Sequence, residues 1–144
     1  MDITAIKPSD RTIEIMRPGA NVPLGIELTL ISVDDERLAK VKRAITDKKL
    51  QLQRKGKDFT ADDLKANKEM ILLATIIDWR WYNPTGVEGD EGYDEEKHPS
   101  IEGDENPEHN PRNVRKCIAL DWFADQVWTE IAETDEFFKN SNRG

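Results

Sequence analysis

The sequence has little of what most catalytic centres need. Its 144 residues include one cysteine and two histidines, and no phosphate-binding, dinucleotide-binding or G-x-S-x-G glycine pattern. Because Cys117 is alone, a disulfide within the chain is excluded, which fits a reducing compartment. His98 and His109 lack the i,i+4 spacing of a helical zinc site. We therefore expect no catalytic residues, no metal ion and no cofactor, and a protein that is not an enzyme.

Long apolar runs are missing as well. No run approaches the length that spans a bilayer, and Met1–Asp10 has no apolar segment of the kind found in signal peptides. The length suits one modest core, so we expect a single domain over residues 1–144. These features predict a cytoplasmic protein with no membrane partner.

Charge, in contrast, is abundant and unevenly placed. The chain carries a net −8, and Asn83–His109 alone holds ten acidic residues and one lysine, a net of −9. We call this segment the acidic loop, and its composition predicts a mobile, solvated connection. The segment Arg37–Lys57, here called the basic arm, has nine basic residues against Asp47. The overall acidity argues against nucleic acid as the default partner.

The N-terminal part is rich in β-branched residues. Thr12–Met16 and Leu24–Ile31 alternate in polarity, and the proline and glycine of Arg17–Pro23 separate them. The pattern predicts a β-hairpin over residues 11–31, preceded by a flexible arm over 1–10. An isolated hairpin is marginal in water, so it must pack on helices or pair with another chain.

Residues 32–82 predict two helices. Ser32, followed by acidic residues, predicts a first helix from Val33 to about Lys55. Its narrow apolar stripe comprises Leu38, Val41, Ile45 and Leu52. Its basic face has three open interpretations: a solvated surface, a contact for an acidic protein (including the acidic loop of a neighbouring subunit), or a contact for nucleic acid.

A capping box of Thr60 with Asp63 begins the second predicted helix, which runs from Ala61 to about Trp79. It is apolar on every side over Met70–Ile77, which predicts the buried centre of the domain. Trp79 and Trp128 fit core positions. Trp81 and Trp122 lie at predicted helix boundaries, where a core role and an interface-anchor role both stay open.

Residues 110–138 predict two further helices, followed by a polar tail over 139–144. Asn110 caps a short helix that begins at Pro111 and ends near Ala119, and Asp121 caps the last helix. The apolar face of that last helix consists of Trp122, Phe123, Val127, Trp128, Ile131 and Ala132. The predicted fold class is α+β, mainly α: an N-terminal β-hairpin and about four helices, with the long acidic loop between helices 2 and 3.

Cation binding by the acidic loop is a further hypothesis. The candidate oxygen ligands are Asp90, Asp94, Glu95 and Glu96, or Asp104 with Glu105. The segment lacks the D-x-D-x-D-G frame and the glutamate twelve positions on that an EF-hand requires. A solvated loop is therefore the favoured interpretation.

The core motifs together resemble a known family. After the hairpin and the charged helix come an aliphatic run ending in Asp-Trp (Ile76–Trp79), a proline-capped Asn-Val-Arg helix (Asn113–Arg115), and Trp-Phe-Ala-Asp-Gln-Val (Trp122–Val127) closing on Phe138. This order resembles the tail assembly chaperones of long-tailed bacteriophages over Thr12–Phe138. The acidic loop departs from the family pattern.

The resemblance implies a non-enzymatic protein that binds the tape measure protein, helps to recruit tail tube subunits, self-associates, acts in the host cytoplasm and is absent from the mature virion. It also implies that this chain is the short form of a product that frameshifting can extend. The expected partner-binding residues are Leu38, Val41, Ile45, Leu52, Trp81, Trp122, Phe137 and Phe138. The alternatives are a small regulator that binds nucleic acid and a cation-responsive module.

Overall fold

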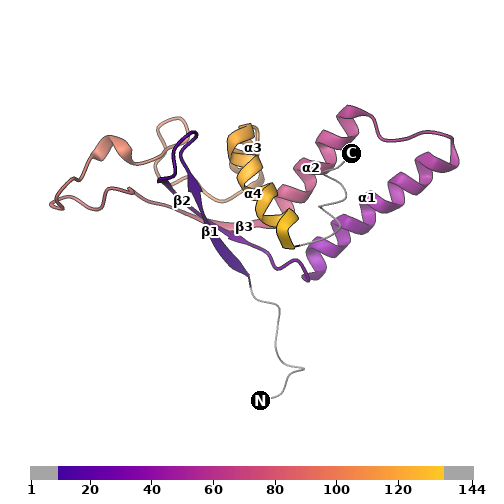
Figure 1. Ribbon diagram of the computed structural model, residues 1–144, viewed down its shortest axis with the longest axis horizontal. Helices are drawn as coiled ribbons and strands as arrows, with labels where there is room; N and C mark the ends of the chain where they lie inside the picture. The colour runs from indigo at the N-terminus through magenta and orange to yellow at the C-terminus, as the bar shows by residue number, and fades with distance from the viewer. Residues whose placement is uncertain (1–9, 135–144) are drawn as a thin grey trace, which may run out of the picture.

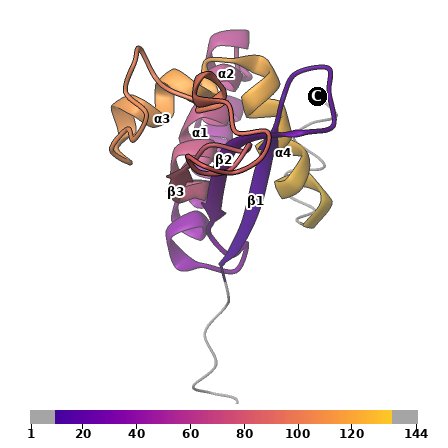
Figure 2. The same ribbon diagram turned by 90° about the vertical axis from the view of Figure 1, so that its left-hand side faces the viewer.

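A three-stranded antiparallel sheet and four α-helices make up the computed structural model, which describes residues 10–134 (Figure 1). The strand order is β1-β2-β3, so neighbours in sequence are neighbours in the sheet. In the end-on view of Figure 2, α4 lies on the β1 side of the sheet and α3 on the β3 side. The predicted α+β class, with its N-terminal hairpin and four helices, is confirmed.

The hairpin forms as its alternating pattern predicts. Strands β1 (Arg11–Met16) and β2 (Pro23–Leu30) pair antiparallel with Ile13 opposite Leu28. The backbone N–H of Arg17 donates to the carbonyl oxygen of Val22 at 2.9 Å and closes the turn. Alternate β2 residues are buried, so one face of the sheet faces the core.

The prediction that the second helix continues to Trp79 is wrong. Helix α2 (Ala61–Thr75) ends four residues earlier, and Ile76–Trp81 forms β3, which pairs with β2. The reason is a two-residue period, since the polar Asp78 and Arg80 alternate with Trp79 and Trp81. Pairing with the hairpin gives that pattern an apolar face inside and a polar face outside.

Helix α1 (Glu36–Arg54) begins later than predicted. Its N-cap is Asp35, whose side chain accepts from the backbone N–H of Arg37 at 2.8 Å, so Ser32 is not the cap. A capping carboxylate that accepts this N–H satisfies one of the unpaired donors of the first turn. The helix ends close to the predicted Lys55, which occupies the C-cap position.

Helix α2 confirms the predicted capping box. The Thr60 hydroxyl accepts from the Asp63 N–H at 3.1 Å, and the Asp63 carboxylate accepts from the Thr60 N–H at 2.9 Å. The prediction of burial on every side is wrong in part. Ile71 and Leu72 are buried, whereas Met70 is exposed, because α1, α3 and α4 pack against α2 on only part of its circumference.

The last two helices follow the prediction, except at one cap. Helix α3 (Pro111–Ile118) has Asn110 as N-cap and Pro111 in its first turn, as predicted. Helix α4 (Asp121–Thr134) includes Asp121 as its first residue, so Asp121 is not its cap. The carbonyl of Leu120 accepts the N–H groups of Phe123 and Ala124, which puts Leu120 at the boundary.

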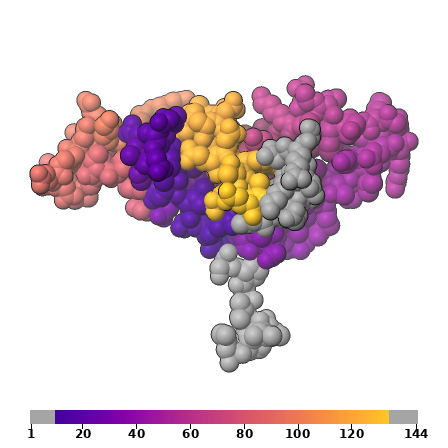
Figure 3. All heavy atoms as spheres, in the orientation of Figure 1, coloured from indigo at the N-terminus to yellow at the C-terminus, as the bar shows by residue number. Residues whose placement is uncertain are grey.

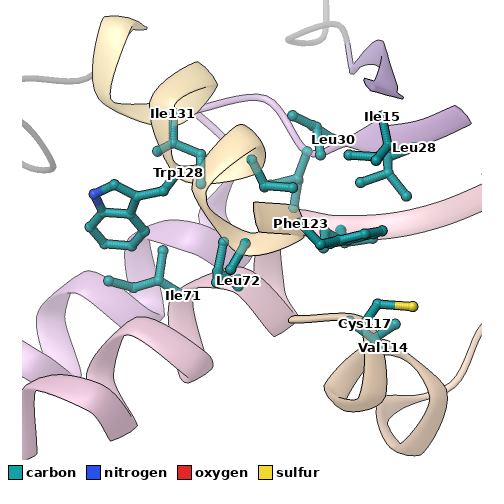
Figure 4. Close-up of a cluster of buried hydrophobic side chains, with 14 of the residues drawn as sticks. Ile15, Leu28, Leu30, Ile71, Leu72, Val114, Cys117, Phe123, Trp128 and Ile131 are labelled. Atoms are coloured by element: carbon teal, nitrogen blue, oxygen red, sulfur yellow. The ribbon is translucent and has the colours of Figure 1, made fainter. Parts of the chain in front are cut away.

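The core lies between the sheet and the helices. Figure 4 shows side chains from β1, β2, α2, α3 and α4 converging on Phe123, which is almost fully buried. The predicted α4 face contributes Phe123, Val127, Trp128 and Ile131 as buried residues, with Trp122 and Ala132 partly buried. Within residues 10–134, no helix combines the length and the apolar character needed to cross a membrane.

The molecule is elongated, with the acidic loop at one end and the basic arm at the other (Figures 1 and 3). The topology explains this arrangement. Trp81, the last residue of β3, pairs with Ile26 near the start of β2, whereas the chain leaves the other end of β2 toward α1. The two oppositely charged segments therefore leave the sheet at opposite ends of β2.

Candidate protein-binding surface

The predicted apolar stripe of α1 is mostly buried within this chain. Leu38 is 1% exposed and Ile45 is 8% exposed, and Val41 packs partly buried against the same core. Leu52, near the far end of α1, is half-buried. Leu38 and Ile45, two of the expected partner-binding residues, are therefore core residues, because α2 packs against α1.

The aromatic candidates divide between core and surface. Trp81 is 9% exposed and its ring meets that of Trp79 edge to face, with 5.4 Å between centroids. Trp122 is partly buried beside Phe123, at 6.0 Å between ring centroids. Phe137 and Phe138 lie outside the described residues. Burial of Trp81 leaves it little area to offer to a partner.

The structure instead presents a groove between α2 and the junction of α3 with α4. It has a volume of about 420 Å³. The α2/α4 groove, as we name it, is lined by Lys65, Lys68, Glu69, Leu72, Arg115, Ile118, Ala119, Asp121 and Ala124. Aliphatic side chains thus stand between charged ones of both signs.

Ion pairs hold the rim of the α2/α4 groove. Arg115 of α3 donates to the Glu69 carboxylate of α2 at 2.9 Å. Lys68 lies 3.4 Å from the Asp125 carboxylate and 5.4 Å from the centroid of the Trp128 ring. Exposed pairs of this kind contribute little stability each, so they are free to exchange for contacts with a partner.

Two exposed leucines flank the α2/α4 groove. Leu120, between the groove residues Ala119 and Asp121, is 45% exposed. Leu64 is 53% exposed and precedes Lys68 by four residues, which places both on one face of α2. Large apolar side chains beside a groove with charged rims are typical of sites that bind proteins.

Three of the carboxylates proposed as cation ligands accept hydrogen bonds from the backbone of the acidic loop. Asp90 accepts from the Val87 N–H at 2.9 Å, and Asp94 accepts from the Glu96 N–H at 3.0 Å, where it caps the short 3-10 turn η2 (Glu95–Lys97). Asp104 likewise accepts from the Asn106 N–H. Between residues 10 and 134, no group of three or more His, Cys, Asp or Glu side chains is arranged to hold a metal ion.

The histidines and the cysteine also have structural roles. The Nε2 of His109 lies 2.9 Å from the carbonyl oxygen of Ile76, and its ring meets Trp79 edge to face. His98 contacts its neighbour, with Nδ1 at 2.8 Å from the Pro99 carbonyl oxygen. Burial raises the pKa of the Cys117 thiol to about 12, which disfavours the reactive thiolate.

The outer face of the sheet carries a polar cluster. Burial, together with a hydrogen bond to Glu14, raises the pKa of Tyr82 to about 12. The Arg80 guanidinium lies 4.4 Å from the centroid of the Tyr82 ring and 3.6 Å from the Glu27 carboxylate. A tyrosine with a raised pKa stays protonated, so Tyr82 serves here as a hydrogen-bond donor to Glu14 and not as a general base.

Comparisons with protein-family models, with curated proteins and with solved structures find no match for this chain. The resemblance to tail assembly chaperones therefore stays a prediction.

Sequence reasoning missed the α2/α4 groove. The available signal was the recurrence of Leu64, Lys68 and Leu72 at four-residue spacing, which puts apolar and basic side chains on one helix face. The other wall comes from the α3–α4 junction, more than forty residues later in the chain. No local pattern indicates that these segments meet.

Proposed function

We propose that this protein binds a helical segment of a partner protein in the α2/α4 groove, and that it acts as a tail assembly chaperone. The observation that carries the proposal is the groove itself, where the partly buried Ile118 and the exposed Leu64 and Leu120 lie in or beside it, among charged side chains of both signs. An amphipathic helix presents a matching surface, since its apolar ridge is bordered by charged residues.

The partner that the family resemblance favours is the tape measure protein, a long helical protein that needs protection from aggregation. Binding in the α2/α4 groove covers one apolar ridge of this client, and the charged rim keeps the complex in solution. Covering the rest of Leu120 contributes about 1 kcal/mol, which is appropriate to a reversible contact. In this role the chaperone also helps to recruit tail tube subunits, acts in the host cytoplasm and is absent from the virion.

Co-expression tests the proposal. The tape measure protein is produced alone, with this chain, and with an unrelated acidic protein of similar size that controls for charge. We expect co-expression with this chain, but not with the control protein, to move the client from the insoluble to the soluble fraction. This chain should also co-purify with the client. Equal recovery in all three cultures, or equal rescue by the control protein, contradicts the proposed function.

A further inference from the structure

The outer surface of α1 is a basic helix face that carries more positive charge than its ion pairs with residues 10–134 neutralise. Within the basic arm, Arg37, Arg43 and Lys48 pair with acidic side chains of this chain. The arm residues that form no ion pair with any described residue are Lys40, Lys49, Arg54, Lys55 and Lys57. Positive charge therefore gathers at the far end of α1, where the helix projects from the body (Figure 1).

The acidic loop carries an excess of negative charge, since few of its carboxylates form ion pairs with residues 10–134. Glu102 pairs with Lys116, and Glu105 lies 3.9 Å from His98. The carboxylates of the loop without an ion pair to a described residue are those of Glu88, Asp90, Glu91, Asp94, Glu95, Glu96, Asp104 and Glu108. The loop is hydrogen-bonded to itself through Asn83 and Asp94, at 2.8 Å, so these charges stand on a defined surface.

Within one molecule, the two surfaces cannot neutralise each other. Helix α1 has 19 residues and a length of roughly 28 Å, and it extends away from the acidic loop along the long axis of the molecule. At physiological ionic strength, exposed charges are screened beyond about 8 Å. Each surface is therefore complementary to the matching end of a second molecule, whereas two arms or two loops repel each other.

From this charge arrangement we propose that the chain assembles head to tail, with the basic arm of one copy against the acidic loop of the next. The occupant of the basic α1 face is thus a second copy of this chain. Such a contact joins two different surfaces, so each added copy leaves one arm and one loop free, and assembly continues until a ring closes. The inference is independent of the client that the α2/α4 groove binds.

Two neutralised variants test this contact. One carries Lys49→Gln, Arg54→Gln and Lys57→Gln in the arm, and the other carries Glu88→Gln, Glu91→Gln and Glu96→Gln in the loop. All six side chains are exposed, so folding should be retained, as circular dichroism can verify. Sedimentation velocity then measures the size of each protein and of their equimolar mixture at about 50 mM and about 500 mM salt.

We expect the wild type to form species larger than a dimer at low salt and to dissociate at high salt. Each variant alone should be at least tenfold weaker in self-association than the wild type. Their mixture should form a dimer and nothing larger, because only one intact arm meets one intact loop. A monomeric wild type at low salt overturns the proposal. The proposal is also overturned if the loop variant self-associates as the wild type does, or if the two variants do not associate when mixed.

Nucleic acid is the competing occupant of the basic arm. Binding of a DNA duplex by the arm variant and the loop variant separates the two cases. If the arm serves nucleic acid, neutralising the loop strengthens DNA binding while leaving self-association unchanged, and this result also overturns the proposal.

Discussion

The indole nitrogen of Trp79 donates a hydrogen bond to the carbonyl oxygen of Pro107 at 2.9 Å, across 28 residues of sequence. The acidic loop starts just after β3, and this bond returns its last residues to β3. His109 adds a second contact at the same place, because a carbonyl oxygen can only accept and its Nε2 must therefore donate to Ile76. The loop is thus closed at its base by the strand from which it leaves.

This closure predicts that Trp79→Phe loosens the acidic loop. A hydrogen bond of this kind contributes about 1 kcal/mol, so amide hydrogen exchange within Asn83–His109 should become about fivefold faster. Trp81→Phe is the matched control, since its buried indole nitrogen has no hydrogen-bond partner among the described residues. Unchanged loop exchange in Trp79→Phe, or an equal change in both variants, refutes the role of this bond.

Gly25 sits where the hairpin, β3 and the acidic loop meet. Its φ of +105° suits glycine, and a Cβ there would overlap the Tyr82 carbonyl oxygen and lie 2.9 Å from Pro84 Cδ. We expect Gly25→Ala to lower the free energy of unfolding by about 2–3 kcal/mol in urea titrations. Gly19→Ala, with a φ of +73° and open space around the Cβ, should lower it by only about 1 kcal/mol. Equal losses would show that Gly25 has no special packing role.

The α2 capping box predicts a dependence of stability on pH. The hydrogen bond from the Thr60 backbone lowers the pKa of Asp63, so the folded state favours its charged form. The resulting stability is present above the ordinary carboxyl pKa and is lost as pH falls through the lowered value. In thermal melts at a series of pH values, Asp63→Asn should reduce the loss of stability at acid pH. Asp62→Asn, which lies outside the capping box, should leave this loss unchanged. Thr60→Ala should cost about 1 kcal/mol.

Cys117 should be inert in the folded protein. A rise in its pKa from 9.0 to about 12 leaves roughly a thousandfold less thiolate at neutral pH, and burial also blocks reagents. A chromogenic disulfide reagent should therefore react with native protein far more slowly than with urea-unfolded protein. Fast labelling before unfolding would show that the site opens locally.

The sequence predicts most of the elements because their signals are local. The capping box at Thr60, the cap at Asn110 and the alternation in β1 and β2 each depend on residues a few positions apart. Strand β3 escaped prediction because Met70–Ile77 is apolar except for Thr75, and its aliphatic run fits a helix as well as a strand. Only pairing with β2 decides between them.

The candidate site was harder to predict. Leu38 and Ile45 have the spacing of an exposed stripe, but nothing local shows that α2 covers them. The α2/α4 groove depends on the packing of α3 and α4 against α2, a tertiary relationship with no counterpart in sequence spacing. The structure thus moves the candidate binding surface from the α1 stripe to the α2/α4 groove. The acidic loop and the basic arm, in contrast, were already evident from the composition of the sequence.

The most direct test of the proposed client site is the affinity of a soluble helical segment of the tape measure protein for a pair of matched variants, measured by titration calorimetry. Leu120→Glu places a charge beside the α2/α4 groove, and Val22→Glu does the same at the hairpin turn, where Val22 is similarly exposed at 48% against 45% for Leu120. We predict at least about tenfold weaker client binding for Leu120→Glu and wild-type affinity for Val22→Glu. Wild-type affinity in both variants would contradict the assignment of the groove as the client site.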